Sequence, residues 1–259
     1  MSTNENSLLV ITAHPDDESI LCGGLLASCS AHGVTVNLLC LTQGEHGQGT
    51  GDIAVCRQAE LKAASDILGV SSTTLLNHED GMLPWIDPAI ICADITKALD
   101  HYCPDVVITF DEDGMYGHPD HIAVHHCTTK VINVHPEQAP ALYYGTTPPR
   151  AMRALTDYVA KQFTTKDHAS ASPTDILGIS DPDAWGHAAP QPTFIFQADD
   201  FSRQKLLALR CHKSQLSDSA LSYVPEAAAS LLLGTEYYRQ APIGRQGRTF
   251  IELTNPSSS

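Results

Sequence analysis

The chain has 259 residues, of which 42% are hydrophobic and 17% are charged, and its formal net charge is −15. These values are typical of a globular protein with a substantial core, built as one large domain or two small ones. The negative charge argues against nucleic acid or an anionic membrane as a partner, because a polyanion would be repelled. No stretch approaches the roughly 20 apolar residues of a membrane-spanning helix, so we expect no membrane association.

Eight cysteines are spread along the chain without a Cys-x-x-Cys pair, and most lie in apolar segments such as residues 38–41. We therefore predict reduced, buried cysteines that form neither disulfides nor metal sites. Residues 1–6 carry no basic side chain, and the apolar run behind them is too short for a secretory signal. Both observations predict a cytoplasmic protein.

Strand-like and helix-like segments alternate over the first half of the chain. The expected strands are residues 8–13, 34–42, 73–77 and 106–110, and the expected helices are residues 19–32, 53–68, 88–101 and 122–134. In the second of these helices, Val55 and Leu61 are expected to share a buried side, and Gly69 is a stop signal. Such alternation implies a mostly parallel sheet with helices on both faces, a Rossmann-like α/β fold.

The second half of the chain is less regular. The elements expected there are strands at 141–147 and 194–197 and helices near 150–163 and at 199–216. Residues 148–192 are low in periodicity and rich in Ser, Ala, Pro and Asp. We interpret them as an irregular surface insertion, with a flap over a site as the alternative. The whole chain, residues 1–259, is interpreted as a single domain that carries this insertion.

Two similar motifs follow two of the expected strands. His-Pro-Asp-Asp at 14–17 comes after the first strand, and His-Pro-Asp-His at 118–121 comes after strand 106–110. Ligands of parallel α/β sheets bind outside the carboxyl ends of the strands. If the two strands are near neighbours, His14, Asp17 and His121 converge. A single His-Pro-Asp is usually a turn, but two copies at strand-to-helix junctions predict a metal site.

The local chemistry of the first motif supports a metal. Pro15 biases His14 away from helical geometry, so the strand can stop with the imidazole facing the crevice. Asp16 and Asp17 fall at a helix N-terminus, where free N–H groups and the dipole keep carboxylates ionised. Two histidines and one carboxylate leave a position open for water, whose pKa Zn²⁺ lowers to about 7. We expect zinc, although nickel, cobalt, iron or manganese could occupy the same ligands.

The two motifs, Ala-His-Pro-Asp-Asp-Glu at 13–18 and Tyr-Gly-His-Pro-Asp-His at 116–121, resemble those of the LmbE/PIG-L family of zinc-dependent N-deacetylases. That family includes the deacetylases of mycothiol and bacillithiol synthesis and the enzyme acting on N-acetylglucosaminyl-phosphatidylinositol. The similarity runs over roughly residues 7–145 and 193–216. Weaker family motifs stand at 42–45, 57–60, 80–81 and 212–215.

The resemblance implies a role for each residue of the two motifs. It implies three metal ligands, His14, Asp17 and His121. Asp16 becomes the general base that takes a proton from the metal-bound water, and His118 the electrophilic partner that donates to the tetrahedral intermediate. Asp120 is expected to orient a neighbouring histidine.

The resemblance also implies substrate contacts at Arg57, Asp80 and Tyr116. The alternative for Arg57 is an exposed helix arginine, and the alternative for Asp80 is a simple turn before Gly81. His46 stands where many relatives carry an arginine, and residues 148–192 have no clear match. The identity of the substrate therefore stays open.

The function implied is that of a zinc-dependent N-acetylglucosaminyl deacetylase, a carbon–nitrogen hydrolase that removes the N-acetyl group from an amino-sugar conjugate. The alternative is a broader amide hydrolase acting on thiol-sugar conjugates or acylated secondary metabolites. A nucleotide-binding module is disfavoured, because two carboxylates occupy the turn where phosphate would bind. The expected partner is a small-molecule amino sugar, and an assembly of identical subunits is compatible with the sequence.

Overall fold

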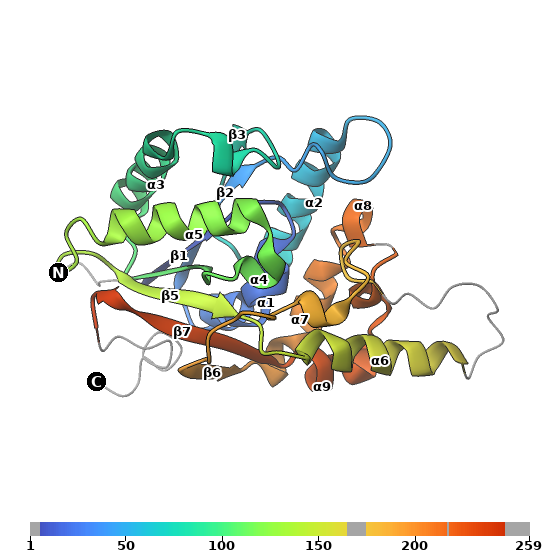
Figure 1. Ribbon diagram of the computed structural model, residues 1–259. Coiled ribbons are helices and arrows are strands. Elements are labelled where there is room, and N and C mark those ends of the chain that lie inside the picture. The colour runs from blue at the N-terminus through green and yellow to red at the C-terminus, as the bar shows by residue number, and fades with distance from the viewer. Residues whose placement is uncertain (1–5, 165–174, 217, 247–259) are drawn as a thin grey trace.

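The computed structural model describes residues 6–164, 175–216 and 218–246, and a seven-stranded sheet of order β3-β2-β1-β4-β5-β7-β6 lies at its centre (Figure 1). The strands are β1 (Ser7–Thr12), β2 (Thr35–Thr42), β3 (Ser72–His78), β4 (Val106–Phe110), β5 (Ala141–Thr146), β6 (Phe194–Gln197) and β7 (Thr235–Gly244). Strands β1 to β5 are parallel, whereas β7 runs antiparallel to both β5 and β6. The predicted mostly parallel sheet is confirmed.

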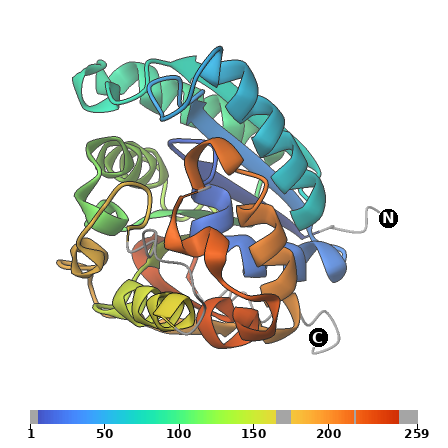
Figure 2. The ribbon, with the colours of Figure 1, turned by 90° about the vertical axis from the view of Figure 1, so that its right-hand side faces the viewer.

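Helices cover both faces of the sheet, as expected for this class. They are α1 (Asp17–Ala31), α2 (Ile53–Leu68), α3 (Pro88–Tyr102), α4 (Gly114–Gly117), α5 (Pro119–Ile132), α6 (Ala151–Thr164), α7 (Ser202–Leu209), α8 (Lys213–Leu216) and α9 (Ala229–Leu233). Helices α1, α2 and α7 pack together on one face, and α3 packs with α5 on the other (Figure 2).

The central strands are buried on both sides, which explains their unbroken apolar sequences. In β1, Leu8, Leu9, Val10 and Ile11 are each 0% exposed. Removing such a side chain from water contributes roughly 1.5–3 kcal/mol, so the burial of these four side chains stabilises the packing of the two helical layers on the sheet. The loops at its carboxyl end are thereby held on a rigid base.

Helix α2 begins and ends where the sequence predicts, because both ends carry local signals. The Asp52 side chain accepts a hydrogen bond from the backbone N–H of Val55, and Gly69 ends the helix at a φ of 71°. The expectation that Val55 is buried is wrong, since it is 61% exposed. At about 100° per residue, Val55 and Leu61 are separated by about 120° around the helix, whereas Arg57 lies about 40° from Leu61. The buried side of α2 therefore carries an arginine.

The structure also corrects the expected helix at 199–216. It is divided into a 3₁₀ turn, α7 and α8, and His212 lies in the break before α8. Strand β7 was not expected at all, because its burial does not alternate regularly along its length. It nevertheless joins β6 to the parallel part of the sheet.

The segment 148–192 contains α6, close to the helix expected at 150–163. It is not only a surface excursion, because Ile176 and Trp185 within it are both 0% exposed. Residues 165–174 of the expected insertion lie outside the described residues.

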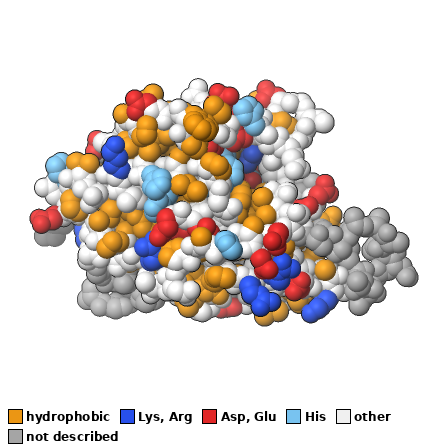
Figure 3. Space-filling view, viewed as in Figure 1, with side chains coloured by type: hydrophobic (Ala, Val, Ile, Leu, Met, Phe, Trp, Pro, Cys, Tyr) orange, Lys and Arg blue, Asp and Glu red, His pale blue; other side chains and the backbone are white. Residues whose placement is uncertain are grey.

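The cysteines are unpaired, as predicted, and Cys22, Cys29 and Cys40 are buried. Burial was wrongly expected for Cys56 and Cys103, which are exposed. No helix in the described ranges has the length and apolar character to cross a bilayer. On the face shown in Figure 3, lysine and arginine side chains are scattered among acidic and hydrophobic ones.

Candidate metal and catalytic site

The two motifs meet because the strands that precede them are neighbours. Strands β1 and β4 pair in parallel, with Leu8 opposite Val106. On one side of this pair the chain continues to β2 and on the other to β5, so the motifs lie at the point where the strand order reverses. Open α/β sheets bind their ligands at such a point. The convergence predicted from the sequence is confirmed.

Two imidazoles and one carboxylate face one another at this point. Nδ1 of His14 lies 3.2 Å from Nε2 of His121. Oδ1 of Asp17 lies 3.2 Å from the same His121 nitrogen, and Oδ2 lies 3.5 Å from Nδ1 of His14. All three side chains are buried.

The other nitrogen of each ring, Nε2 of His14 and Nδ1 of His121, points away from this group and is called the outer nitrogen. Both outer nitrogens face hydrogen-bond acceptors only. Nε2 of His14 lies 3.1 Å from Oδ2 of Asp120 and 3.1 Å from Oδ1 of Asp80. Nδ1 of His121 lies 3.1 Å from the carbonyl oxygen of Gly114. Each outer nitrogen therefore carries a hydrogen, so in a neutral ring the inner nitrogen has a lone pair directed at the other ring.

Facing lone pairs beside a carboxylate fit a shared cation. Two nitrogen ligands of a tetrahedral zinc ion are about 3.3 Å apart, which matches the spacing of the inner nitrogens. Burial alone would lower the pKa of His14, but hydrogen bonds to Asp120, Asp17 and Asp80 raise it well above its usual value. Burial alone would raise the pKa of Asp17, and His121 and His14 bring it well below its usual value. The surroundings thus favour a positive charge at this point.

Asp120 fixes the orientation of His14 from behind. It is fully buried, and its carboxylate accepts the backbone N–H groups of Gly81 at 2.8 Å and Leu83 at 3.1 Å. Its remaining contact is the one to Nε2 of His14. Asp120 therefore contacts a neighbouring histidine in the way expected from the sequence.

Asp16 lies beside this cluster with its backbone in an unusual conformation. Its φ of 125° falls in a region that favours glycine, which marks local strain. Burial raises the pKa of Asp16 to about 6, although the neighbouring Arg57 acts to lower it. Burial thus outweighs the helix N-terminus, which the sequence suggested would keep this carboxylate fully ionised.

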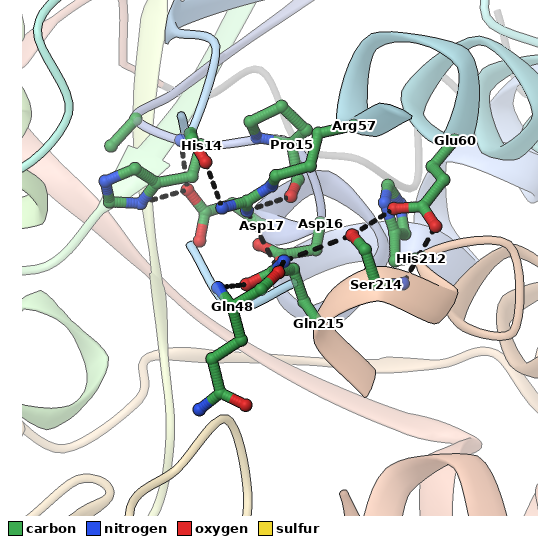
Figure 4. Close-up of polar contacts among 12 residues, drawn as sticks. His14, Pro15, Asp16, Asp17, Gln48, Arg57, Glu60, His212, Ser214 and Gln215 are labelled. Atoms are coloured by element: carbon green, nitrogen blue, oxygen red, sulfur yellow. Dashed lines mark hydrogen bonds and ion pairs between the residues drawn. The ribbon is translucent and has the colours of Figure 1, made fainter. Parts of the chain in front are cut away.

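Arg57 is buried, at 5% exposure, so the alternative of an exposed helix arginine is wrong. Its Nη2 donates to Oδ2 of Asp16 at 3.2 Å and to the carbonyl oxygen of Pro15 at 2.6 Å. Its Nη1 donates to the carbonyl oxygen of Gly44 at 3.0 Å. Arg57 thus joins the first motif to the Gly-rich loop that follows β2 (Figure 4).

His118 has surroundings unlike those of His14. Its Nδ1 accepts the backbone N–H of Asp120 at 3.2 Å, so a neutral ring carries its proton on Nε2. Burial, with the adjacent His121 and His14, lowers the pKa of His118 to about 4. The ring is therefore a neutral hydrogen-bond donor. Its ligand atom also lies close enough to those of His14 and His121, within 4.8 Å, for a three-histidine set.

Comparison with known proteins identifies the family. The family model described as "PIG-L: GlcNAc-PI de-N-acetylase" matches residues 9–132. A 1D-myo-inositol 2-acetamido-2-deoxy-alpha-D-glucopyranoside deacetylase from Geodermatophilus obscurus is 30% identical over 277 residues, which cover 92% of each chain. The chain belongs to the PIG-L family. The resemblance inferred from the two motifs is confirmed.

Solved structures of proteins with different reactions share the fold of this chain. The N,N'-diacetylchitobiose deacetylase of Pyrococcus horikoshii aligns with a TM-score of 0.63 at 23% identity, over 92% of this chain and 85% of that one. A 4-carboxy-2-hydroxymuconate hydratase from Pseudomonas putida aligns with a TM-score of 0.64 at 16% identity, over 94% and 99%. Such likenesses establish the fold alone. The reaction must be argued from side chains, because deacetylases and a hydratase share this architecture.

A cavity of about 340 Å³ in this PIG-L family member is lined by His14, Asp16, Asp17 and His118. The three residues expected to contact substrate, Arg57, Asp80 and Tyr116, all line it. The sequence did not single out the other lining side chains Gln48 and Leu177. Gln48 follows the Gly-Glu motif, which was a usable signal, whereas Leu177 lies in the segment without family motifs.

Asp80 is not a simple turn residue. Its Oδ1 contacts His14, and its Oδ2 accepts the backbone N–H of His46 at 3.2 Å. The His46 ring lies with Nδ1 2.8 Å from the Asp80 carbonyl oxygen. Asp80 thus connects the loop after β2 to His14.

Tyr116 lines the cavity and packs against a residue of the insertion that lies behind it. Its ring centroid lies 5.6 Å from that of His121 and 4.5 Å from that of the fully buried Trp185. Burial raises the pKa of Tyr116, so its hydroxyl stays protonated. The next residue of the insertion, Gly186, donates its N–H to the carbonyl oxygen of Met115 at 2.7 Å.

Proposed function

We propose that the protein is a metal-dependent hydrolase that removes the N-acetyl group from an amino-sugar conjugate, with N-acetylglucosamine as the sugar. One observation carries this proposal. Two imidazole nitrogens and a carboxylate converge on one point, with Asp16 and the neutral donor His118 beside them. Hydrolysis of an amide needs a base for water and a donor for the oxyanion and the departing amine.

In this proposal, Nδ1 of His14, Nε2 of His121 and the carboxylate of Asp17 would hold the metal. Three protein ligands of this kind, with room left for a reactant, are typical of catalytic zinc sites, which favours zinc. A divalent ion held there supplies Lewis acidity toward water and the amide carbonyl.

Asp16 is the proposed general base. Its carboxylate lines the cavity, and Arg57 binds only one of its two oxygens, Oδ2. It takes a proton from the attacking water as the new C–O bond forms, and this proton then leaves with the amine as the C–N bond breaks.

His118 is the proposed electrophilic partner. Because its Nδ1 is engaged by the Asp120 N–H, its Nε2–H is the hydrogen available to a ligand in the cavity. A neutral donor at this position stabilises the oxyanion of the tetrahedral intermediate.

For the substrate we propose contacts from Tyr116, Asp80 and Arg57. All three side chains line the cavity beside the proposed base. The name of the matching family and the relative from Geodermatophilus obscurus, an acetamido-glucopyranoside deacetylase, support an amino sugar as substrate. The unpaired state of all eight cysteines supports a reducing, cytoplasmic location.

The test combines metal analysis of the purified protein with acetate release from a panel of N-acetylglucosamine conjugates. We expect one bound divalent ion per chain, loss of activity on chelation, and recovery on adding Zn²⁺. Thiol-sugar conjugates and acylated antibiotics belong in the panel, because their preferential cleavage would favour the broader amide hydrolase. Metal-free protein that releases acetate at an undiminished rate would refute the proposal.

A further inference from the structure

The start of α1 is built in an uncommon way. An aspartate at the N-cap of a helix normally accepts a backbone N–H two or three residues later. Asp16 occupies the N-cap of α1 but makes no such bond. Its carboxylate is directed to Arg57 and the cavity instead. Some other group must therefore hold the backbone of Asp16 at its φ of 125°.

That group is the carboxylate of Glu18. The side chain is 0% exposed, and its Oε2 accepts the backbone N–H of Asp16 at 3.0 Å. Its Oε1 accepts the hydroxyl of Ser19. Glu18 thus takes over backbone bonding at the helix start and leaves the Asp16 carboxylate free for the cavity.

A buried carboxylate requires a partner, and Glu18 finds it 194 residues away. Nε2 of His212 lies 2.8 Å from Oε1 of Glu18, and His212 is also 0% exposed. The break between α7 and α8 brings this ring to the start of α1.

The residues after His212 form hydrogen bonds to α2 and to the loop after β2 (Figure 4). Ser214 donates its backbone N–H and its hydroxyl to Glu60 of α2, at 2.8 and 2.6 Å. The Gln215 amide exchanges two hydrogen bonds with the backbone of Gln48, at 2.8 and 3.1 Å. His212 is therefore held at a fixed position relative to Glu18.

We propose that Glu18 and His212 are positioning residues for the general base. Glu18 holds the backbone of Asp16, and His212 orients the Glu18 carboxylate and offsets its negative charge. This inference rests on the proposed function of Asp16. Neither residue lines the cavity, so both act through Asp16 rather than on the substrate.

The chain contains a matched control on the same helix. Glu236 accepts the backbone N–H groups of Gly24 and Leu25 in α1, and its cationic partner is Lys205 at 2.6 Å. Both members of this pair are buried. As in the Glu18–His212 pair, a buried glutamate holds backbone N–H groups of α1 and is bound by a buried basic side chain, but this stretch of backbone carries no proposed catalytic group.

The experiment compares His212→Met with Lys205→Met in the metal-loaded, full-length protein. Both remove the partner of a buried glutamate and are expected to lower the thermal midpoint. Only His212→Met is expected to lower kcat, by about 10–100-fold, with KM within about twofold and metal content unchanged. His212→Gln, which restores a donor, is expected to recover kcat to within about threefold of the parent protein. Equal kcat values for His212→Met and Lys205→Met, or a change confined to KM, would overturn the proposal.

Hydrogen exchange tests the same contact without a substrate. In His212→Met, the Asp16 amide is expected to exchange about tenfold faster than in Lys205→Met, because its acceptor is no longer held. If His212→Met does not fold, Ser19→Ala removes a milder contact to Glu18 and is expected to show a smaller increase of the same kind. Unchanged exchange refutes the positioning role. A parent protein that releases no acetate refutes the proposed function instead.

Discussion

The two His-Pro-Asp motifs share three consecutive residues, yet the structure uses them differently. In the first, the N-cap of the following helix is the third residue, Asp16; in the second, it is the first residue, His118. The helix therefore begins two residues earlier relative to the second motif. His14 is left at a strand end among carboxylates, whereas the ring of His118 accepts the Asp120 N–H and caps its own helix.

This shift separates the chemistry of equivalent residues. Three carboxylates raise the pKa of His14 in spite of its burial, whereas burial and two neighbouring histidines lower that of His118 to about 4. The residue at which the helix starts, rather than the motif sequence, determines which histidine faces a site for a cation and which one acts as a hydrogen-bond donor. Four substitutions test this contrast, from the largest expected effect to the smallest.

His14→Ala removes one of the two facing lone pairs of the first motif. We expect loss of the bound ion and a fall in acetate release of about 10⁴-fold, because the metal's contribution disappears with it. Metal content and kcat are the measurements. Retention of a stoichiometric ion would contradict the ligand assignment.

Asp16→Asn keeps the shape of the side chain but removes its basicity. Acetate release is expected to fall by about 10³-fold while the ion stays bound, because general bases contribute about 10²–10⁴-fold. The check is kcat together with metal analysis on the same sample. Activity close to that of the parent protein would exclude Asp16 as the base.

His118→Ala tests the contrast directly, because His118 is the residue of the second motif that is equivalent to His14. We expect the ion to stay bound and kcat to fall by about 10²-fold, as for the loss of one oxyanion donor. If this variant loses the ion as His14→Ala does, the three-histidine ligand set is correct instead.

Asp120→Asn alters the second motif at the residue equivalent to Asp16. It weakens the contact to Nε2 of His14, so metal affinity is expected to fall by about 10–100-fold. Competition with a chelator measures this affinity. An Asp120→Asn protein as inactive as Asp16→Asn at saturating metal would show that Asp120 acts in the reaction itself.

The sequence predicted elements whose signals are local. Helix α2 carries both a capping aspartate and a left-handed glycine, and β4 is a short apolar run, so their bounds match the prediction. Strand β7 escaped prediction because its burial follows no regular alternation.

The convergence of His14, Asp17 and His121 was predictable because each motif stands directly after a recognisable strand. The pairing of Glu18 with His212 was not, since these residues are 194 positions apart and only the break between α7 and α8 joins them. The burial of Arg57 could have been deduced from helical periodicity alone, because it lies on the same side of α2 as Leu61.

The contacts of Trp185 with Tyr116 and of Gly186 with Met115 limit how the insertion can be exchanged. A β-carbon on Gly186 would lie 1.9 Å from the carbonyl oxygen of Thr147, so no side chain fits there. Grafts that aim to change specificity by importing a relative's segment must therefore retain this Trp-Gly pair, or Tyr116 loses the partner against which it packs.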